Sequence, residues 1–149
     1  MFTIRNARKG DEGAIMELIK ALALYEKAPE EVSNTAEELG KHLFDEGICE
    51  SLVVEVNDRI VGFALYYTNY STWKGKCLYL EDFFVIPDFR RDGIGSALFD
   101  AVVEVAKIRG VRRMDWQVLE WNEPAINFYR KKNAVLDPEW INGRLFFEK

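Results

Sequence analysis

The alternation of apolar and polar positions along the chain predicts a mixed α/β protein. Strands are indicated where apolar residues alternate or cluster, at 2–7, 51–56, 59–70, 76–86, 112–119 and 143–149. Apolar residues at helical spacing predict an amphipathic helix ending near Tyr25 and another over 96–110. Cap residues predict a short helix after Thr35 and one over 123–132. The element order is therefore β-α-α-β-β-β-α-β-α-β, a sheet with helices on its faces.

Turn and cap residues sharpen these boundaries. Asn57-Asp58 joins two apolar runs as the turn of a β-hairpin, and Pro87 ends the third run. Thr35, with a glutamate three residues later, is typical of a capping box. Asn122 is expected to cap the last helix, which Asn133 ends in the left-handed conformation.

Composition narrows the class of protein. With 149 residues, 48% of them hydrophobic and 30% charged, the chain is expected to fold as one soluble domain spanning 1–149. No apolar run approaches the roughly 18 residues of a membrane span, and the N-terminus lacks the apolar core of a signal peptide. We therefore expect a cytoplasmic protein without a membrane partner.

Charge and the rarer residue types exclude several kinds of chemistry. A formal net charge of -5 argues against a nucleic-acid partner and is compatible with a cationic substrate. Two cysteines and one histidine are too few for a zinc cluster, so no metal site is expected. The same scarcity disfavours a nucleophile activated by histidine, and the two cysteines are expected to be reduced thiols.

The most informative segment is LEDFFVIPDFRRDGIGS, residues 80–96. A strand runs into a loop containing Gly93 and Gly95, and a helix begins there. Glycines let a ligand approach the backbone, and the first turn of a helix attracts anions. Arg90 and Arg91 add positive charge, so the residues alone point to a ligand that carries phosphate. The alternative is an ordinary strand-turn-helix with capping glycines, and neither a Walker loop nor a full dinucleotide fingerprint is present.

Within this segment, RRDGIG resembles the R/Q-x-x-G-x-G/A signature of the GNAT acetyltransferase superfamily. YLEDFFVIPDFRRDGIGS, EWNEPAINFY and LALYE are further similar to the diamine acetyltransferase branch, which includes spermidine/spermine and thialysine acetyltransferases. The resemblance covers essentially the whole chain. It implies a mostly antiparallel sheet that is splayed in the middle and flanked by helices, acetyl-CoA as co-substrate, and a homodimer.

The resemblance also implies which residues contact acetyl-CoA. Main-chain groups of one strand would pair with the pantetheine arm as an added strand does; these belong to Phe83, Phe84 and Val85. The glycine loop and helix start would hold the pyrophosphate through Arg90, Arg91, Asp92, Gly93, Ile94, Gly95 and Ser96. Asn122 would contact the cofactor from the other side of the splayed sheet.

The same resemblance implies a catalytic pair and an amine pocket. Tyr129 matches the general acid of the family, and the residues that line the amine pocket match Tyr25, Glu26, Glu81 and Asp82. An amine arrives as ammonium and must lose a proton before it attacks, for which we favour Glu81 as the base, acting through a water. Because Glu81 and Asp82 are consecutive in a strand, their side chains are expected on opposite faces of the sheet.

The expected activity is direct acetyl transfer to a small cationic amine, such as a polyamine or thialysine, in a ternary complex. Two alternatives remain open: an enzyme acting on a peptide or protein amine, and a non-catalytic module that binds acetyl-CoA. The chain departs from the branch in two places. Asn133-Ala134 replaces the usual glycine-alanine, and Trp140 lies upstream of the 142–146 segment NGRLF instead of within it.

Overall fold

The computed structural model of the protein describes residues 1–147, except for the side chain of Arg91. It forms two compact units, Met1–Gln117 and Val118–Lys149, called here the N-terminal and C-terminal units. No helix in the described part is long and apolar enough to cross a membrane.

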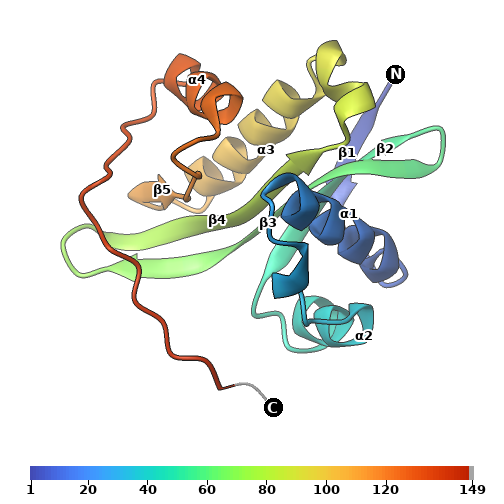
Figure 1. Cartoon of the computed structure of the whole chain (residues 1–149), viewed down its shortest axis with the longest axis horizontal. Helices are drawn as coiled ribbons and strands as arrows, with labels where there is room; N and C mark the ends of the chain where they lie inside the picture. Colours follow the sequence, from blue (N-terminus) through green and yellow to red (C-terminus); the bar gives the residue numbers. More distant parts are fainter. Residues whose placement is uncertain (148–149) are drawn as a thin grey trace. The chain divides into compact units, whose positions relative to one another are not determined.

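The N-terminal unit is built on a five-stranded sheet with the strand order β1-β2-β3-β4-β5 (Figure 1). Its strands are β1 (Thr3–Asn6), β2 (Glu50–Val56), β3 (Arg59–Ser71), β4 (Gly75–Val85) and β5 (Arg113–Asp115). The first four pair antiparallel with their neighbours, and β5 pairs parallel with β4. The mixed and mostly antiparallel sheet predicted from the sequence is confirmed.

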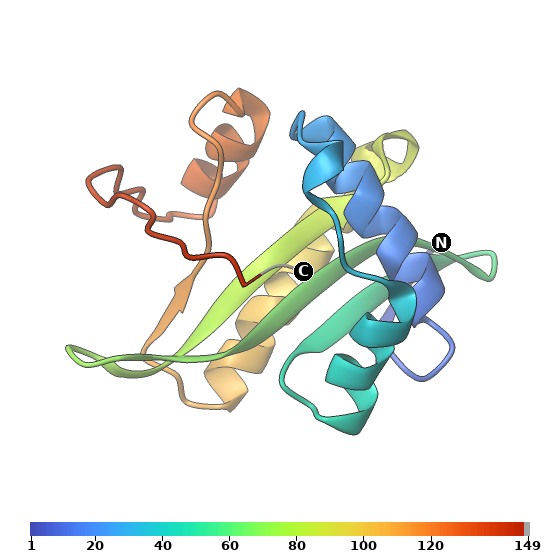
Figure 2. The ribbon, with the colours of Figure 1, turned by 60° about the horizontal axis from the view of Figure 1, so that its bottom comes forward.

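Helices cover both faces of this sheet. The helices of the N-terminal unit are α1 (Glu12–Tyr25), α2 (Ala36–Gly40) and α3 (Ile94–Ile108), with shorter helical turns at Pro29–Glu31, Lys41–Asp45 and Pro87–Asp92. Figure 2 shows α1 and α2 on one face and α3 on the other. The C-terminal unit contains α4 (Glu123–Lys131).

The predicted turns and caps explain why these elements begin and end where they do. Asn57 and Asp58 have φ angles of 50° and 65°, the left-handed pair that a two-residue hairpin requires. The Thr35 hydroxyl accepts a hydrogen bond from the Glu38 N–H at 3.2 Å, which starts α2. Gly110 (φ 68°) follows α3, and Asn133 (φ 65°) follows α4.

The α1 face of the sheet carries a continuous hydrophobic core. Buried residues of α1, among them Ile15 and Leu18, pack against Phe63 and Leu65 of β3 and Phe84 of β4. Burying side chains of this size contributes about 1.5–3 kcal/mol each to folding. These contacts fix the position of α1 over β3 and β4, next to the candidate site.

Two expectations about strands were wrong. The run 112–119 forms a strand only over Arg113–Asp115, and residues 143–147 form no strand, while Glu148 and Lys149 lie outside the described residues. A strand needs a ladder partner for its main-chain groups, and within the described chain no strand pairs with 143–147. Strand-like composition alone was therefore insufficient.

Candidate active site

The loop between β4 and α3 has the backbone shape of an anion-binding turn. After the helical turn Pro87–Asp92, Gly93 takes a left-handed φ of 74°, a conformation that favours glycine. Gly95 follows in the first turn of α3. A Cβ atom placed on Gly95 would meet no described atom within 4 Å beyond its chain neighbours and the backbone of its own helix. The fold itself therefore leaves open the space over this glycine.

The start of α3 presents its dipole to that space. No side chain caps this end of the helix among the described residues, and Ile94 is anchored in the core. The first N–H groups of a helix are not used within it, and they carry the positive end of the helix dipole. A pyrophosphate is the kind of ligand that such a turn accepts.

Beside this loop the sheet opens. Strand β5 pairs only with Cys77–Tyr79, so within the described chain the remainder of β4 has a strand on one edge only. This confirms the predicted splay. The Phe83 ring contacts Phe99 of α3 at 5.7 Å between centroids, and Phe84 packs in the core on the α1 side. Since both rings are packed within the protein, contacts of these residues with a ligand at the open edge would involve main-chain groups.

Arg90 joins the loop to the end of α1. Its Nε donates a hydrogen bond to the Val85 carbonyl at 2.8 Å, and its guanidinium lies 5.3 Å from the Phe84 ring centroid and 5.5 Å from that of Tyr25. These are distances of cation–π contacts. The structure thus directs this side chain toward Tyr25, whereas the sequence suggested only a phosphate contact.

A β-bulge changes the expected arrangement of the two carboxylates in β4. Asp82 pairs with Leu65, and Leu80 pairs with Tyr66, so Glu81 is an extra residue opposite no partner. Residues paired across strands share a face, which puts Asp82 on the α1 face together with Leu65. Tyr67 follows Leu65 by two residues in β3 and therefore lies on the same face of the sheet. The Glu81 side chain reaches this face as well, because its carboxylate accepts a hydrogen bond from the Tyr67 hydroxyl. The expectation of opposite faces is wrong, because it assumed an unbroken strand.

The carboxylates that converge here affect one another. Burial, with the nearby charges of Glu81 and Glu26, raises the pKa of Asp82 to about 7. Burial also raises the pKa of Glu26, which caps the C-terminal end of α1. The structure therefore brings together the predicted pocket residues Glu26, Glu81 and Asp82, and the Asp82 carboxyl titrates near neutral pH.

Two tyrosines belong to this cluster and were missed from the sequence. Tyr67 and Tyr79 pair across β3 and β4, with ring centroids 5.4 Å apart. Burial, with the charge of Glu81 nearby, raises the pKa of Tyr67 to about 12 and also raises the pKa of Tyr79. Both are therefore neutral phenols at physiological pH. Alternation along β3 from Leu65 would have placed Tyr67 on this face, but its pairing with Tyr79 depends on the hairpin register.

Asn122 and Tyr129 lie in the C-terminal unit. The Asn122 side chain accepts a hydrogen bond from the Ala125 N–H at 3.4 Å and caps α4, as predicted. Tyr129 is buried near the end of this helix, with its ring 5.5 Å from that of Phe128. Its carbonyl accepts a hydrogen bond from the Ala134 N–H, so the residues after α4 fold back onto the helix end.

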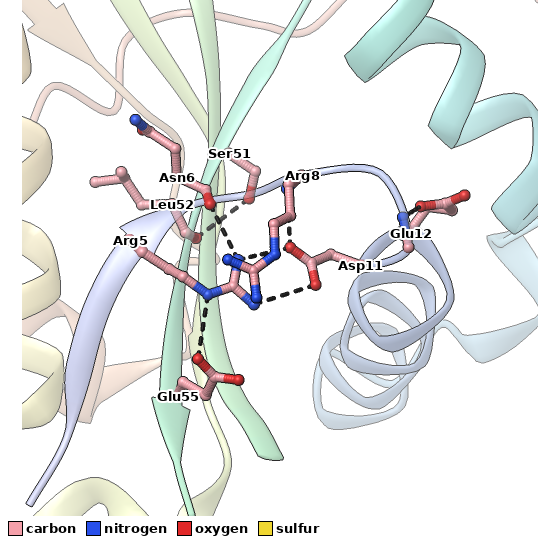
Figure 3. Close-up of polar contacts among 9 residues, drawn as sticks. Arg5, Asn6, Arg8, Asp11, Glu12, Ser51, Leu52 and Glu55 are labelled. Atoms are coloured by element: carbon pink, nitrogen blue, oxygen red, sulfur yellow. Dashed lines mark hydrogen bonds and ion pairs between the residues drawn. The ribbon is translucent and has the colours of Figure 1, made fainter. Parts of the chain in front are cut away.

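A cavity of about 770 Å³ in the N-terminal unit is lined by Arg5, Asp11 and Glu55 among other residues. Among the predicted site residues whose side chains the structure describes, Phe84 alone lines it. Figure 3 shows the main polar group of its wall: Arg5 forms ion pairs with Asp11 at 2.8 Å and Glu55 at 3.1 Å. The hydrogen bond from Arg5 lowers the pKa of Asp11. These ion pairs hold β1, β2 and the start of α1 together, so we assign them a structural role.

Comparison with known proteins agrees with the geometry. Residues 15–134 match the model of the acetyltransferase (GNAT) family. The thialysine N-epsilon-acetyltransferase of Bos taurus is 40% identical over 140 residues, covering 88% of this chain and 82% of that protein. The spermidine/spermine N(1)-acetyltransferase-like protein 1 of Homo sapiens is 37% identical over 142 residues, 90% of this chain but 20% of that longer protein.

Solved structures show the same fold. An aminoglycoside N-acetyltransferase in complex with a bisubstrate analogue containing CoA superposes with a TM-score of 0.82. The alignment covers 98% of this chain and 99% of that one, at 20% sequence identity.

Proposed function

The chain belongs to the acetyltransferase (GNAT) family and is an acetyl-CoA-dependent N-acetyltransferase, and on this premise we propose that it acetylates a small cationic amine by direct attack in a ternary complex. The acceptor class is a polyamine, thialysine or a related base. We take residues 1–149 as one catalytic domain, because the family match crosses from one unit into the other. A homodimer in the cytoplasm is part of the same proposal.

Acetyl-CoA lies along the open edge of β4 in this proposal. The pantetheine arm meets the main chain of Phe83–Val85, and the pyrophosphate rests on the turn Arg90–Ser96 at the start of α3. Asn122 contacts the cofactor from the opposite side. Two observations support this position: the strand edge left open by the short β5, and the unobstructed glycine at the helix start.

The acceptor amine lies among Tyr25, Glu26, Glu81 and Asp82. It enters as an ammonium and gives up a proton through a water to Glu81, while the neighbouring carboxylates hold the cation. The free amine then attacks the thioester carbonyl, an N–C bond forms, and the C–S bond breaks. Tyr129 donates a proton to the departing thiolate and regains one from the proton that the nitrogen loses on becoming an amide, while Glu81 releases the first proton to solvent, so charge and protons balance over the reaction.

The observation that carries the proposal is the open space over Gly95. A Cβ atom at this position has open space around it, so we expect Gly95→Val to fold normally and to obstruct a ligand lying against the helix start. We expect at least a ten-fold loss of acetyl-CoA affinity by calorimetry, with an unchanged melting temperature. Gly13→Val in α1, where a Cβ also meets no atom within 4 Å, is the matched control. Equal acetyl-CoA affinity of both variants would refute the position of the pyrophosphate.

A further inference from the structure

The side chain of Arg90 joins the end of β4 to the end of α1. Its Nε donates a hydrogen bond to the Val85 carbonyl at 2.8 Å, while its guanidinium lies 5.3 Å from the ring centroid of Phe84 and 5.5 Å from that of Tyr25. Among the described residues, no carboxylate forms an ion pair with it. A planar guanidinium can donate a hydrogen bond and stack on aromatic rings at once, which a lysine ammonium cannot.

The carbonyl that Arg90 binds lies on the open edge of the sheet. The Ile86 N–H donates a hydrogen bond to the Val61 carbonyl at 2.9 Å, toward β3. Main-chain groups of successive residues in an extended strand point to opposite edges. The Val85 carbonyl therefore points away from β3, to the edge that has no strand partner within the described chain. Arg90 thus ends the stretch of β4 along which the pantetheine arm is proposed to lie.

The end of α1 that Arg90 contacts has a strained backbone. The Ala28 N–H donates a hydrogen bond to the Ala23 carbonyl at 2.9 Å and closes the last turn around Lys27. The φ angle of Lys27 is 65°, a left-handed conformation that glycine usually supplies at this position. A residue with a side chain adopts it at a cost in free energy, and it persists only where surrounding contacts hold it. The stacking of Arg90 on Tyr25, the last residue of α1, is such a contact.

Glu26 follows Tyr25 directly, so its place depends on how the end of α1 is held. Burial raises the pKa of the Glu26 carboxyl, and the charge of Glu26 contributes to the raised pKa of Asp82 in β4. The two carboxyls are therefore close enough to interact across the space between α1 and β4. A shift of the helix end would separate them or expose Glu26 to solvent.

We infer that Arg90 is a positioning residue of the amine pocket: it holds Tyr25, and with it Glu26, against the end of β4. The inference rests on the proposed function, in which the acceptor amine lies beside Glu26 and Asp82. The main chain of Arg90 remains part of the turn that takes the pyrophosphate, so one residue links the cofactor loop to the amine pocket. An arginine that only bound phosphate would set the affinity for acetyl-CoA, whereas a positioning arginine sets KM for the amine.

Steady-state kinetics with spermidine and thialysine as acceptors, and calorimetry of acetyl-CoA binding, distinguish the two roles. Arg90→Lys keeps the charge but loses the combination of hydrogen bond and stacking. We expect it to raise KM for the better acceptor roughly five-fold, which is about 1 kcal/mol at 1.4 kcal/mol per factor of ten and the order of one cation–π contact. The kcat and the Kd for acetyl-CoA should change by less than about two-fold.

Arg59→Lys is the matched control. The Arg59 guanidinium lies 5.9 Å from the ring centroid of Phe89 in the same loop, and loss of that contact should change neither KM nor Kd. The opposite pattern for Arg90 would overturn the inference. A weaker Kd for acetyl-CoA in Arg90→Gln that Arg90→Lys restores, with an unchanged KM for the amine in both variants, would make Arg90 a phosphate ligand.

A double-mutant cycle tests whether Arg90 acts through Tyr25. Tyr25→Phe keeps the ring and Tyr25→Leu removes it, so Arg90→Lys should raise KM roughly five-fold in the first background and less than about two-fold in the second. An equal factor in both backgrounds would overturn the inference. Kinetics are measured well below the melting temperature of each variant, so that unfolding does not enter KM. If the wild-type protein acetylates neither amine, or Glu26→Gln leaves KM for the amine unchanged, the proposed function fails instead, and with it the pocket that Arg90 positions.

Discussion

Neutralising Asp82 should change how the stability of the protein depends on pH. The pKa of this carboxyl is raised from 3.8 to about 7 by burial and by the charges of Glu81 and Glu26. At a pH between these two pKa values, the Asp82 carboxyl is protonated in the folded protein and ionised in the unfolded chain. The stabilisation from this proton is complete below pH 3.8 and is lost as the pH rises through about 7.

The magnitude follows from the size of the shift. At 1.36 kcal/mol per pKa unit, a shift of about three units corresponds to an upper limit of about 4 kcal/mol over the whole range. Between pH 5 and pH 8.5 the limit is about 3 kcal/mol, and partial exposure of the side chain reduces the expected change to about 1–2 kcal/mol. Asp82→Asn keeps the shape of the side chain but cannot titrate, so its stability should not show this loss.

Urea unfolding of the wild-type protein and Asp82→Asn at pH 5 and pH 8.5 measures the effect directly. At each pH we subtract the free energy of unfolding of the wild-type protein from that of the variant. We expect this difference to be about 1–2 kcal/mol larger at pH 8.5 than at pH 5. Asp88→Asn, at an exposed position, is the control and should give no such change. If the free energies of unfolding of the two proteins differ by the same amount at both pH values, the raised pKa of Asp82 is refuted. The convergence of carboxylates that causes the raised pKa is then refuted as well.

Two other substitutions test separate parts of the structure. Tyr129→Phe should lower kcat by ~10²–10⁴-fold with little change in KM for the amine or in acetyl-CoA affinity, because the proton that we propose it supplies is needed only as the thiolate departs. A normally stable variant with near-normal kcat in a thiol-release assay would reduce Tyr129 to a core aromatic. Gly62→Ala should destabilise the fold by about 1–3 kcal/mol in urea unfolding, since its Cβ would lie 3.1 Å from both the Phe84 carbonyl oxygen and the Val85 side chain. Gly13→Ala, in open space, is its control, and equal stability of the two variants would contradict the close packing of β3 against β4.

Local patterns in the sequence determined most of the elements. The turn at Asn57-Asp58, the cap at Thr35 and the glycine before α3 act over two to four residues, so their effect was predictable without knowledge of distant contacts. The strand-loop-helix segment ending at Ser96 pointed to a phosphate-bearing ligand for the same reason. The family signature added the identity of that ligand.

Only the tertiary structure decided how the carboxylates of the proposed amine site come together. The bulge at Glu81 exists because β3 and β4 pair in a register that leaves one residue unmatched, and strand alternation alone predicted the opposite arrangement. The contact of Arg90 with Tyr25 likewise depends on residues remote in the chain. The segment 143–147 has strand-like composition, but a strand forms only where another supplies its hydrogen bonds, and pairing across a sheet is a property of the whole fold.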